Sequence, residues 1–302
     1  MHLGGYAMSD GTSIQWSDAT WNPVTGCESV SAGCDHCYAR TFAERWRGTA
    51  GHYFEHGFDL VLRPTKLDEP LAWRKPRRIF VNSMSDLFHK NIPDEYIARV
   101  FAVMARCPQH AFQLLTKRHA RMRSLIGGLD GSGHRLIEAT TDEETAQALH
   151  NAPWPLPNLH LGVSVEDQRS ADTRIITLFD TPAAVRWVSI EPMISAVDLT
   201  WCAGVNALER DWNGYTGAPH ALLDWVVVGG ETGPVARPMD VRWARALVSQ
   251  CQHARVPVFV KQLGVRWDRD SHADPSAWPE DLRVREFPRV GNQSDSVGAV
   301  NR

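Results

Sequence analysis

The segment 225–229 reads Trp-Val-Val-Val-Gly, a run in which apolar residues follow one another without alternation. Continuous apolarity is typical of a strand that is buried on both faces, as in a parallel sheet. A first strand is expected near residues 19–24, and further runs of the same kind cover residues 78–83, 111–116, 160–165, 185–190 and 256–260. The sequence therefore predicts about seven buried strands.

Helical periodicity occupies several intervals between these runs. The apolar face of one predicted helix, which begins near Asp94, consists of Ile97, Val100, Phe101 and Met104. Another helix is expected to begin near Asp240, a residue type that favours helix N-termini. Strands and helices thus alternate, which predicts an α/β fold. About seven strands fit a complete or partial parallel (β/α) barrel better than a flat doubly wound sheet.

The chain has 302 residues, of which 43% are hydrophobic, and this is enough for a large core. We expect an N-terminal extension at residues 1–15 and a barrel domain at 16–267. Irregular insertions are expected near 124–156 and 200–223, and a partly disordered tail at 268–302. No Gly-rich phosphate-binding motif follows a predicted strand, so neither dinucleotide nor P-loop binding is indicated.

Charge and hydropathy limit the class of protein. The formal net charge is −3, so the chain as a whole does not resemble a nucleic-acid binder. Two basic runs, 74–78 and 117–123, either face a polyanion or form solvated surfaces. No run approaches the roughly 18 apolar residues of a membrane helix, and residues 1–10 lack a secretory pattern. A cytoplasmic location without membrane association is the expectation.

Three cysteines cluster in one short segment. Cys27, Cys34 and Cys37 have the spacing C-x6-C-x2-C on a glycine-containing loop that follows the first predicted strand. Three thiolates can hold three irons of a 4Fe–4S cluster and leave the fourth iron open to a small molecule. The other cysteines, at widely spaced positions 107, 202 and 251, are expected to be buried small hydrophobic residues.

The same cysteines permit a second interpretation. With His36 or His52 as a fourth ligand they could bind structural zinc, and the chain would then be a non-enzymatic binding or scaffold module. His36 discriminates between the two hypotheses, because its ligation would remove the open coordination site.

Polar residues follow nearly every predicted strand, which is where βα barrels build their active sites. The candidate binding residues at these positions are Asn82, Ser83, Asp86, Ser164, Glu166, Glu191, Glu231 and Lys261. Glu191 and Lys261 directly follow apolar runs, so each should be bound to a ligand, solvated by a cavity or paired with the other. Glu231 could instead be a simple surface acid. Arg237 either binds a carboxylate or phosphate or has a structural role.

The cysteine loop resembles that of the radical SAM superfamily, whose common pattern is C-x3-C-x2-C. Residues 34–38 (Cys-Asp-His-Cys-Tyr) resemble its C-x2-C half, whereas the first gap is longer here. A closer resemblance is to a family of phage- and prokaryote-encoded three-cysteine proteins related to that superfamily. The segments that carry it are 16–39, 81–88, 161–167, 187–192, 229–239 and 260–264.

This resemblance implies a barrel of the radical SAM type and a radical SAM enzyme. The three cysteines would hold a 4Fe–4S cluster, and S-adenosyl-L-methionine would chelate the open iron. One electron passed to the sulfonium would release methionine and a 5′-deoxyadenosyl radical that abstracts a hydrogen from the substrate. A flavodoxin- or ferredoxin-like protein would supply that electron.

The resemblance also implies roles for the polar residues. Asn82, Ser83 and Asp86 match positions that hold the methionine amino group. The later strand ends, with Ser164, Glu166, Glu191, Glu231 and Lys261, would bind the rest of S-adenosylmethionine and the substrate. A base or nucleotide in phage DNA or another nucleic acid, which would be modified or isomerised, is the expected substrate class. No residue is assigned to the final hydrogen transfer.

Overall fold

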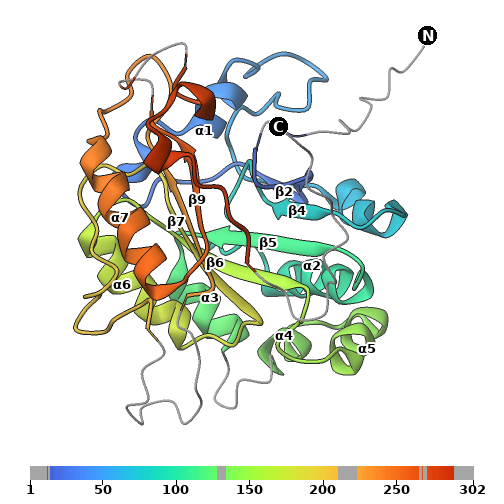
Figure 1. Cartoon of the computed structure of the whole chain (residues 1–302). Coiled ribbons are helices and arrows are strands. Elements are labelled where there is room, and N and C mark those ends of the chain that lie inside the picture. Colours follow the sequence, from blue (N-terminus) through green and yellow to red (C-terminus); the bar gives the residue numbers. More distant parts are fainter. Residues whose placement is uncertain are drawn as a thin grey trace.

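A single parallel sheet of seven strands forms the centre of the protein and curls into half a barrel (Figure 1). The computed structural model describes residues 12, 14–127, 134–209, 223–264, 267 and 271–288. In spatial order the strands are β1 (Ala19–Trp21), β4 (Arg78–Val81), β5 (Ala111–Thr116), β6 (Leu159–Val165), β7 (Val185–Ile190), β8 (Trp225–Gly229) and β9 (Val258–Gln262). The predictions of an α/β fold and of about seven parallel strands in a partial barrel are confirmed.

The first strand is shorter than expected. The run near 19–24 divides into β1 and β2 (Val24–Thr25), and β2 pairs antiparallel with β3 (Val61–Leu62) in a separate small sheet. Pro23 lies at the division and has no N–H to continue a ladder. Its carbonyl accepts hydrogen bonds from the backbone N–H of Arg63 and from the Tyr96 hydroxyl. This break directs the chain from the sheet into the cysteine loop.

Helices follow most of the strands. They are α1 (Tyr38–Glu44), α2 (Asp94–Arg106), α3 (His119–Ile126), α4 (His134–Glu138), α5 (Glu143–Asn151), α6 (Gln168–Phe179) and α7 (Val241–Ala254). The short 3-10 turns are Ala32–Cys34, Pro64–Lys66, Glu69–Ala72, Pro275–Ala277 and Glu280–Leu282. The predicted helix starts near Asp94 and Asp240 are confirmed, and the Asp240 carboxylate accepts from the N–H of Arg242. Within the described ranges, no helix is both long and apolar enough to cross a membrane.

The prediction of an irregular insertion near 124–156 needs correction. The insertion near 124–156 contains α4 and α5, which lie beside α2 (Figure 1). Asp142 caps α5 by accepting from the N–H of Thr145, a local signal that the weak apolar periodicity of this segment obscured. In the expected tail, residues 271–288 pack against the barrel and bury Trp278 and Leu282. Residues 210–222 of the second insertion and 289–302 of the tail lie outside the described residues.

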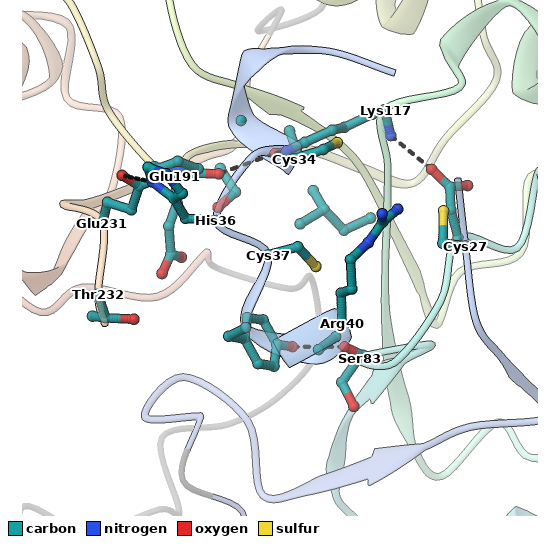
Figure 2. A pocket seen from close by; sticks show the side chains of 18 of the residues that line it. Cys27, Cys34, His36, Cys37, Arg40, Ser83, Lys117, Glu191, Glu231 and Thr232 are labelled. Carbon is teal, nitrogen blue, oxygen red and sulfur yellow. Dashed lines mark hydrogen bonds and ion pairs between the residues drawn. The ribbon is translucent and has the colours of Figure 1, made fainter. Parts of the chain in front are cut away.

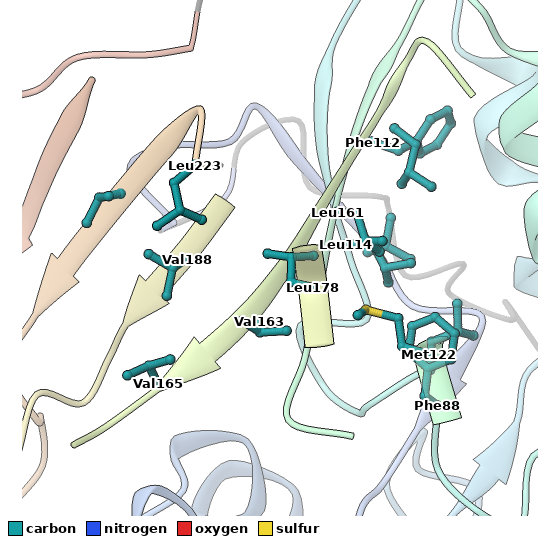
Figure 3. Close-up of a cluster of buried hydrophobic side chains, with 14 of the residues drawn as sticks. Phe88, Phe112, Leu114, Met122, Leu161, Val163, Val165, Leu178, Val188 and Leu223 are labelled. Carbon is teal, nitrogen blue, oxygen red and sulfur yellow. The ribbon is translucent and has the colours of Figure 1, made fainter. Parts of the chain in front are cut away.

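The two faces of the sheet carry different side chains. Toward the helices, β5 and β6 direct Leu114, Leu161 and Val163 into the large apolar core (Figure 3). The other face carries an aromatic cluster made of Trp16, Phe80, Trp187, Trp225 and Phe259. Because side chains alternate along a strand, the residues that follow these aromatics on the same face point into the half-barrel. The interior of the half-barrel is therefore lined by aromatic side chains along the strands and by polar side chains at their C-terminal ends.

Candidate metal and cofactor site

A cavity of about 540 Å³ lies at the C-terminal ends of the strands, where the active sites of βα barrels are found. All three clustered cysteines line it. Of the other predicted residues, those that line it are Asn82, Ser83, Asp86, Ser164, Glu191, Glu231 and Lys261. The strand-end prediction thus brings together residues from six separate chain segments. Glu166 is the exception, because it is not part of the lining.

The backbone before the first cysteine is tightly held. Gly26 has φ +88°, and a Cβ built on it would lie 2.0 Å from the carbonyl oxygen of Asp59. Its N–H donates to the Met84 carbonyl at 2.9 Å, and the N–H of Cys27 donates to the Phe58 carbonyl at 3.3 Å. Only glycine fits such a conformation and such a close approach. Gly26 therefore fixes the point at which the cysteine loop leaves β2.

The six cysteines fall into two groups of three, as predicted. All six are free thiols; Cys107, Cys202 and Cys251 are buried, whereas the three clustered cysteines are partly exposed. Burial, followed by the charge of Asp86, raises the pKa of the Cys27 thiol to about 11, against the opposing effect of Arg118. This thiol donates to the Glu28 carbonyl at 3.3 Å.

The three sulfur atoms do not converge. Figure 2 shows the sulfur atoms of Cys27, Cys34 and Cys37 separated from one another around the cavity. Within the described part of the chain, no group of three or more His, Cys, Asp or Glu side chains is close enough to hold a metal ion. The donor chemistry fits a thiolate-bound metal, since three free thiols share one cavity. Binding through all three requires the Cys27 thiol to lose its proton.

A buried carboxylate ties the second half of the cysteine loop to the end of β8. Glu231 accepts from Arg237 through Nε at 3.0 Å, Nη2 at 2.6 Å and the backbone N–H at 2.7 Å. Its Oε2 also lies 3.0 Å from Nδ1 of His36. Arg237 reaches the loop itself, donating to the carbonyl of Ala32 at 2.8 Å and to Asp35 at 3.2 Å. Figure 2 shows Glu231 beside His36 at the cavity wall.

Glu231 is therefore not a simple surface acid, and Arg237 has a structural partner. Only 6% of Glu231 is exposed. Burial raises the pKa of this carboxyl, but the hydrogen bonds from Arg237 and His36 lower it further, so the pKa is about 2. The group is a permanent anion at neutral pH.

Glu191 and Lys261 form a salt bridge across the cavity wall. Lys261 Nζ lies 2.5 Å from Glu191 Oε1, and each side chain is about one-fifth exposed, at 19% and 18%. The Gln262 amide donates to the same oxygen at 3.3 Å. Nearby, Lys117 Nζ donates to Ser164 Oγ at 2.5 Å. The mutual salt bridge weighed from the sequence is the observed arrangement, and the pair still borders the cavity.

Glu166 lies outside the cavity and packs against the cysteine loop. It is 1% exposed, and its carboxylate accepts hydrogen bonds from both terminal nitrogens of Arg174, at 2.7 Å and 3.2 Å. A Cβ built on Gly33 would lie 3.2 Å from Glu166 Cδ, so the cysteine loop rests directly on this ion pair. Glu166 therefore supports the loop, and its contact with a ligand stays a prediction.

The three residues after β4 have different surroundings. Asp86 accepts from Thr116 Oγ1 at 2.8 Å and from the N–H groups of Phe88 and Lys117 at 3.0 Å each, so both oxygens of its carboxylate have partners inside the protein. The Ser83 hydroxyl exchanges hydrogen bonds with the side chain of Asn22. Asn82, by contrast, is 3% exposed and neither atom of its amide has a partner among the described residues.

Several lining residues were not predicted as site residues. Tyr38 donates from its hydroxyl to the Ser83 carbonyl at 2.6 Å and so links α1 to β4. Arg40, three positions after Cys37, donates to Ser29 Oγ at 3.1 Å. Its position in the first turn of α1, directly after the cysteine loop, is the sequence feature that could have predicted its place in the lining. Trp16 precedes β1, so no strand-end position marked it. His52 does not line the cavity and stacks on Trp46 instead.

Comparison with known proteins gives one result. No curated protein and no solved structure significantly matches the chain. A family model described as "Protein of unknown function (DUF5131)" matches residues 11–293. Since this match covers nearly the whole sequence, the chain belongs to the DUF5131 family.

Proposed function

We propose that this protein is a radical SAM enzyme in which Cys27, Cys34 and Cys37 hold a 4Fe–4S cluster. The observation that carries the proposal is that three free cysteines on one loop line a single cavity at the C-terminal ends of a parallel half-barrel. Three cysteine ligands leave one iron of such a cluster open. When bound, the cluster and S-adenosylmethionine supply the one-electron chemistry that generates a radical.

The residues of the chain then have separable tasks. The ion pairs of Glu231 with Arg237 and of Glu166 with Arg174 hold the cysteine loop against the barrel. Tyr38 and Gly26 fix the two ends of that loop against neighbouring segments. Asn82 and the pair of Glu191 and Lys261 offer polar groups to S-adenosylmethionine and the substrate. The aromatic residues Trp16 and Phe80 close the cavity below and exclude water there.

The substrate class proposed is a base or nucleotide of a nucleic acid, and the electron donor a flavodoxin- or ferredoxin-like protein. The support for the substrate class is that Arg40 and Lys117 place positive charge in the cavity lining. Both cationic side chains can bind a phosphate group of a nucleotide.

Metal analysis tests the proposal. After anaerobic reconstitution the full chain should contain about four irons and four sulfides per molecule. Each of the variants Cys27→Ala, Cys34→Ala and Cys37→Ala should lose most of them, whereas Cys107→Ala, which alters a buried cysteine far along the chain, should not. Iron that is unaffected by all three loop variants would refute the assignment of the ligands.

One observation favours a second candidate, a structural zinc site. A histidine that binds a metal through one ring nitrogen usually donates a hydrogen bond from its other ring N–H, often to a carboxylate. His36 Nδ1 lies 3.0 Å from Glu231 Oε2. The other nitrogen of His36 would then complete a Cys3His zinc site in a binding or scaffold protein. His36→Gln separates the two candidates, because it would abolish zinc binding but leave iron–sulfur content largely intact.

A further inference from the structure

Asn82 is a buried polar side chain without an internal partner. It is 3% exposed, and neither its amide nitrogen nor its amide oxygen forms a hydrogen bond within the described protein. Leaving a buried donor and a buried acceptor unpaired costs roughly 1–3 kcal/mol each. The backbone of Asn82 has φ +61°, a conformation that few residues other than asparagine and glycine adopt. Asn82 also lines the cavity, so a ligand there can satisfy its amide.

The neighbouring side chains restrict the chemistry of that ligand. Trp16 and Phe80 line the same cavity, with ring centroids 4.6 Å apart, and offer apolar surface to a planar ring. The indole N–H of Trp16 also lacks a partner in the part of the chain that the structure describes. These atoms present two donors and one acceptor beside aromatic rings. A neutral amide in such surroundings suits a neutral heterocycle better than a charged ammonium or carboxylate group.

We propose that Asn82 recognises adenine through a bidentate hydrogen bond. The amide oxygen accepts from the exocyclic amino group, and the amide nitrogen donates to the adjacent ring nitrogen; asparagine pairs with adenine in this way elsewhere. This inference deepens the proposed function and rests on it for the identity of the ligand. It replaces the methionine amino group, which the family resemblance implied for Asn82, by the base.

The shared chemistry is adenine, which has two possible sources. One is the adenosyl group of S-adenosylmethionine, and the other is an adenine base of the substrate. Competition distinguishes them. Displacement of adenosine by S-adenosylmethionine at one shared site assigns the adenosyl group, whereas simultaneous binding of both assigns a substrate base.

Calorimetric titration of the full chain with free nucleosides tests the inference without any turnover. The probes are adenosine, purine riboside, which lacks only the amino group, inosine and free methionine. We expect wild-type protein to bind adenosine about tenfold to hundredfold more tightly than purine riboside. The Asn82→Gly variant, which tolerates the positive φ, should lose this preference. Ser85→Ala is the matched control, since Ser85 lines the same cavity but its hydroxyl donates to the Val24 carbonyl at 2.8 Å, and it should keep the preference.

Several outcomes would overturn the inference. Equal affinity of wild-type protein and Asn82→Gly for adenosine would remove Asn82 from the site. Inosine binding as tightly as adenosine would exclude recognition of the exocyclic amino group. Methionine binding that depends on Asn82 would show that Asn82 contacts the methionine part of S-adenosylmethionine instead. Because adenosine binding needs no cluster, it can succeed where the iron–sulfur assignment fails, and it can fail where that assignment succeeds.

Discussion

The carboxylate of Glu231, at the end of β8, lies 3.0 Å from Nδ1 of His36, between the second and third cysteines of the loop. Arg237 donates to both of its oxygens and also to the loop carbonyl of Ala32. The position of the loop that carries Cys34 and Cys37 thus depends on an anion contributed from about 200 residues later in the chain.

Glu231→Gln keeps the shape of this side chain but removes the charge. Since a hydrogen bond to a charged group contributes about 1.5–3 kcal/mol, we expect a loss of stability of that order and a lower iron content after reconstitution. Urea unfolding and iron analysis on the same preparation measure the two effects. Glu28→Gln, an exposed carboxylate on the same loop, is the control. If both variants behave alike, Glu231 does not organise the loop.

Gly26, at the entry to the cysteine loop, and Gly48, which follows α1, form a matched pair. Both have positive φ, +88° and +79°, but only Gly26 has backbone atoms where a Cβ would lie. We expect Gly26→Ala to cost about 1–3 kcal/mol more than Gly48→Ala, because overpacking adds to the conformational strain that the two share. Chemical denaturation compares the free energies of unfolding. Equal losses would mean that the backbone near Asp59 moves away freely.

The pair of Glu191 and Lys261 should show energetic coupling. Each of the single variants Glu191→Gln and Lys261→Met leaves the other charge mostly buried and unpaired, so each should destabilise the protein by about 1–3 kcal/mol. The double variant should lose less than the sum of the two. A double-mutant cycle on the exposed pair of Arg245 and Asp281 provides the comparison and should give a coupling of at most about 1 kcal/mol. Additive losses at Glu191 and Lys261 would contradict a functional ion pair.

His160, on the inner face of β6, predicts a pH dependence of stability. Burial lowers the pKa of this imidazole to about 4, from an ordinary value of 6.5. Between these two pH values the unfolded chain binds a proton that the folded chain does not, so the free energy of unfolding falls as the pH falls from 6.5 to 4. The contribution of one such group to the slope is at most about 1.4 kcal/mol per pH unit.

His160→Gln removes this titration and should flatten the pH profile of urea unfolding in that window. The exposed His253, on α7, supplies the control variant His253→Gln, which should leave the profile unchanged. An imidazole of His160 that titrates near pH 6.5 by NMR would show that the inner face is accessible to water.

Much of the fold follows from short-range pattern. Six of the seven strands were located by continuous apolar runs, and the residues that end them, such as Glu191 and Lys261, reach one cavity because parallel strands share an edge. The division of the first strand depended on Pro23. The packing of residues 271–288 depended on burial of Trp278 and Leu282 against distant segments, which periodicity does not report.

The site was predictable only in part. Position at a strand end located the cysteine loop and Asn82, but it did not separate residues that face the cavity from those that support it. Glu166 pairs with Arg174, which lies one strand-to-helix connection later, and Asp86 is used by backbone N–H groups. Such assignments depend on side-chain direction, which the sequence pattern does not specify.

The most direct test of the central claim is electron paramagnetic resonance of the anaerobically reconstituted, reduced full-length protein, with and without S-adenosylmethionine. The account predicts a reduced 4Fe–4S signal that changes when S-adenosylmethionine is added and that is absent when Cys27, Cys34 and Cys37 are all replaced by alanine. Stoichiometric zinc without iron after reconstitution, or a cluster signal that S-adenosylmethionine leaves unchanged, would contradict it.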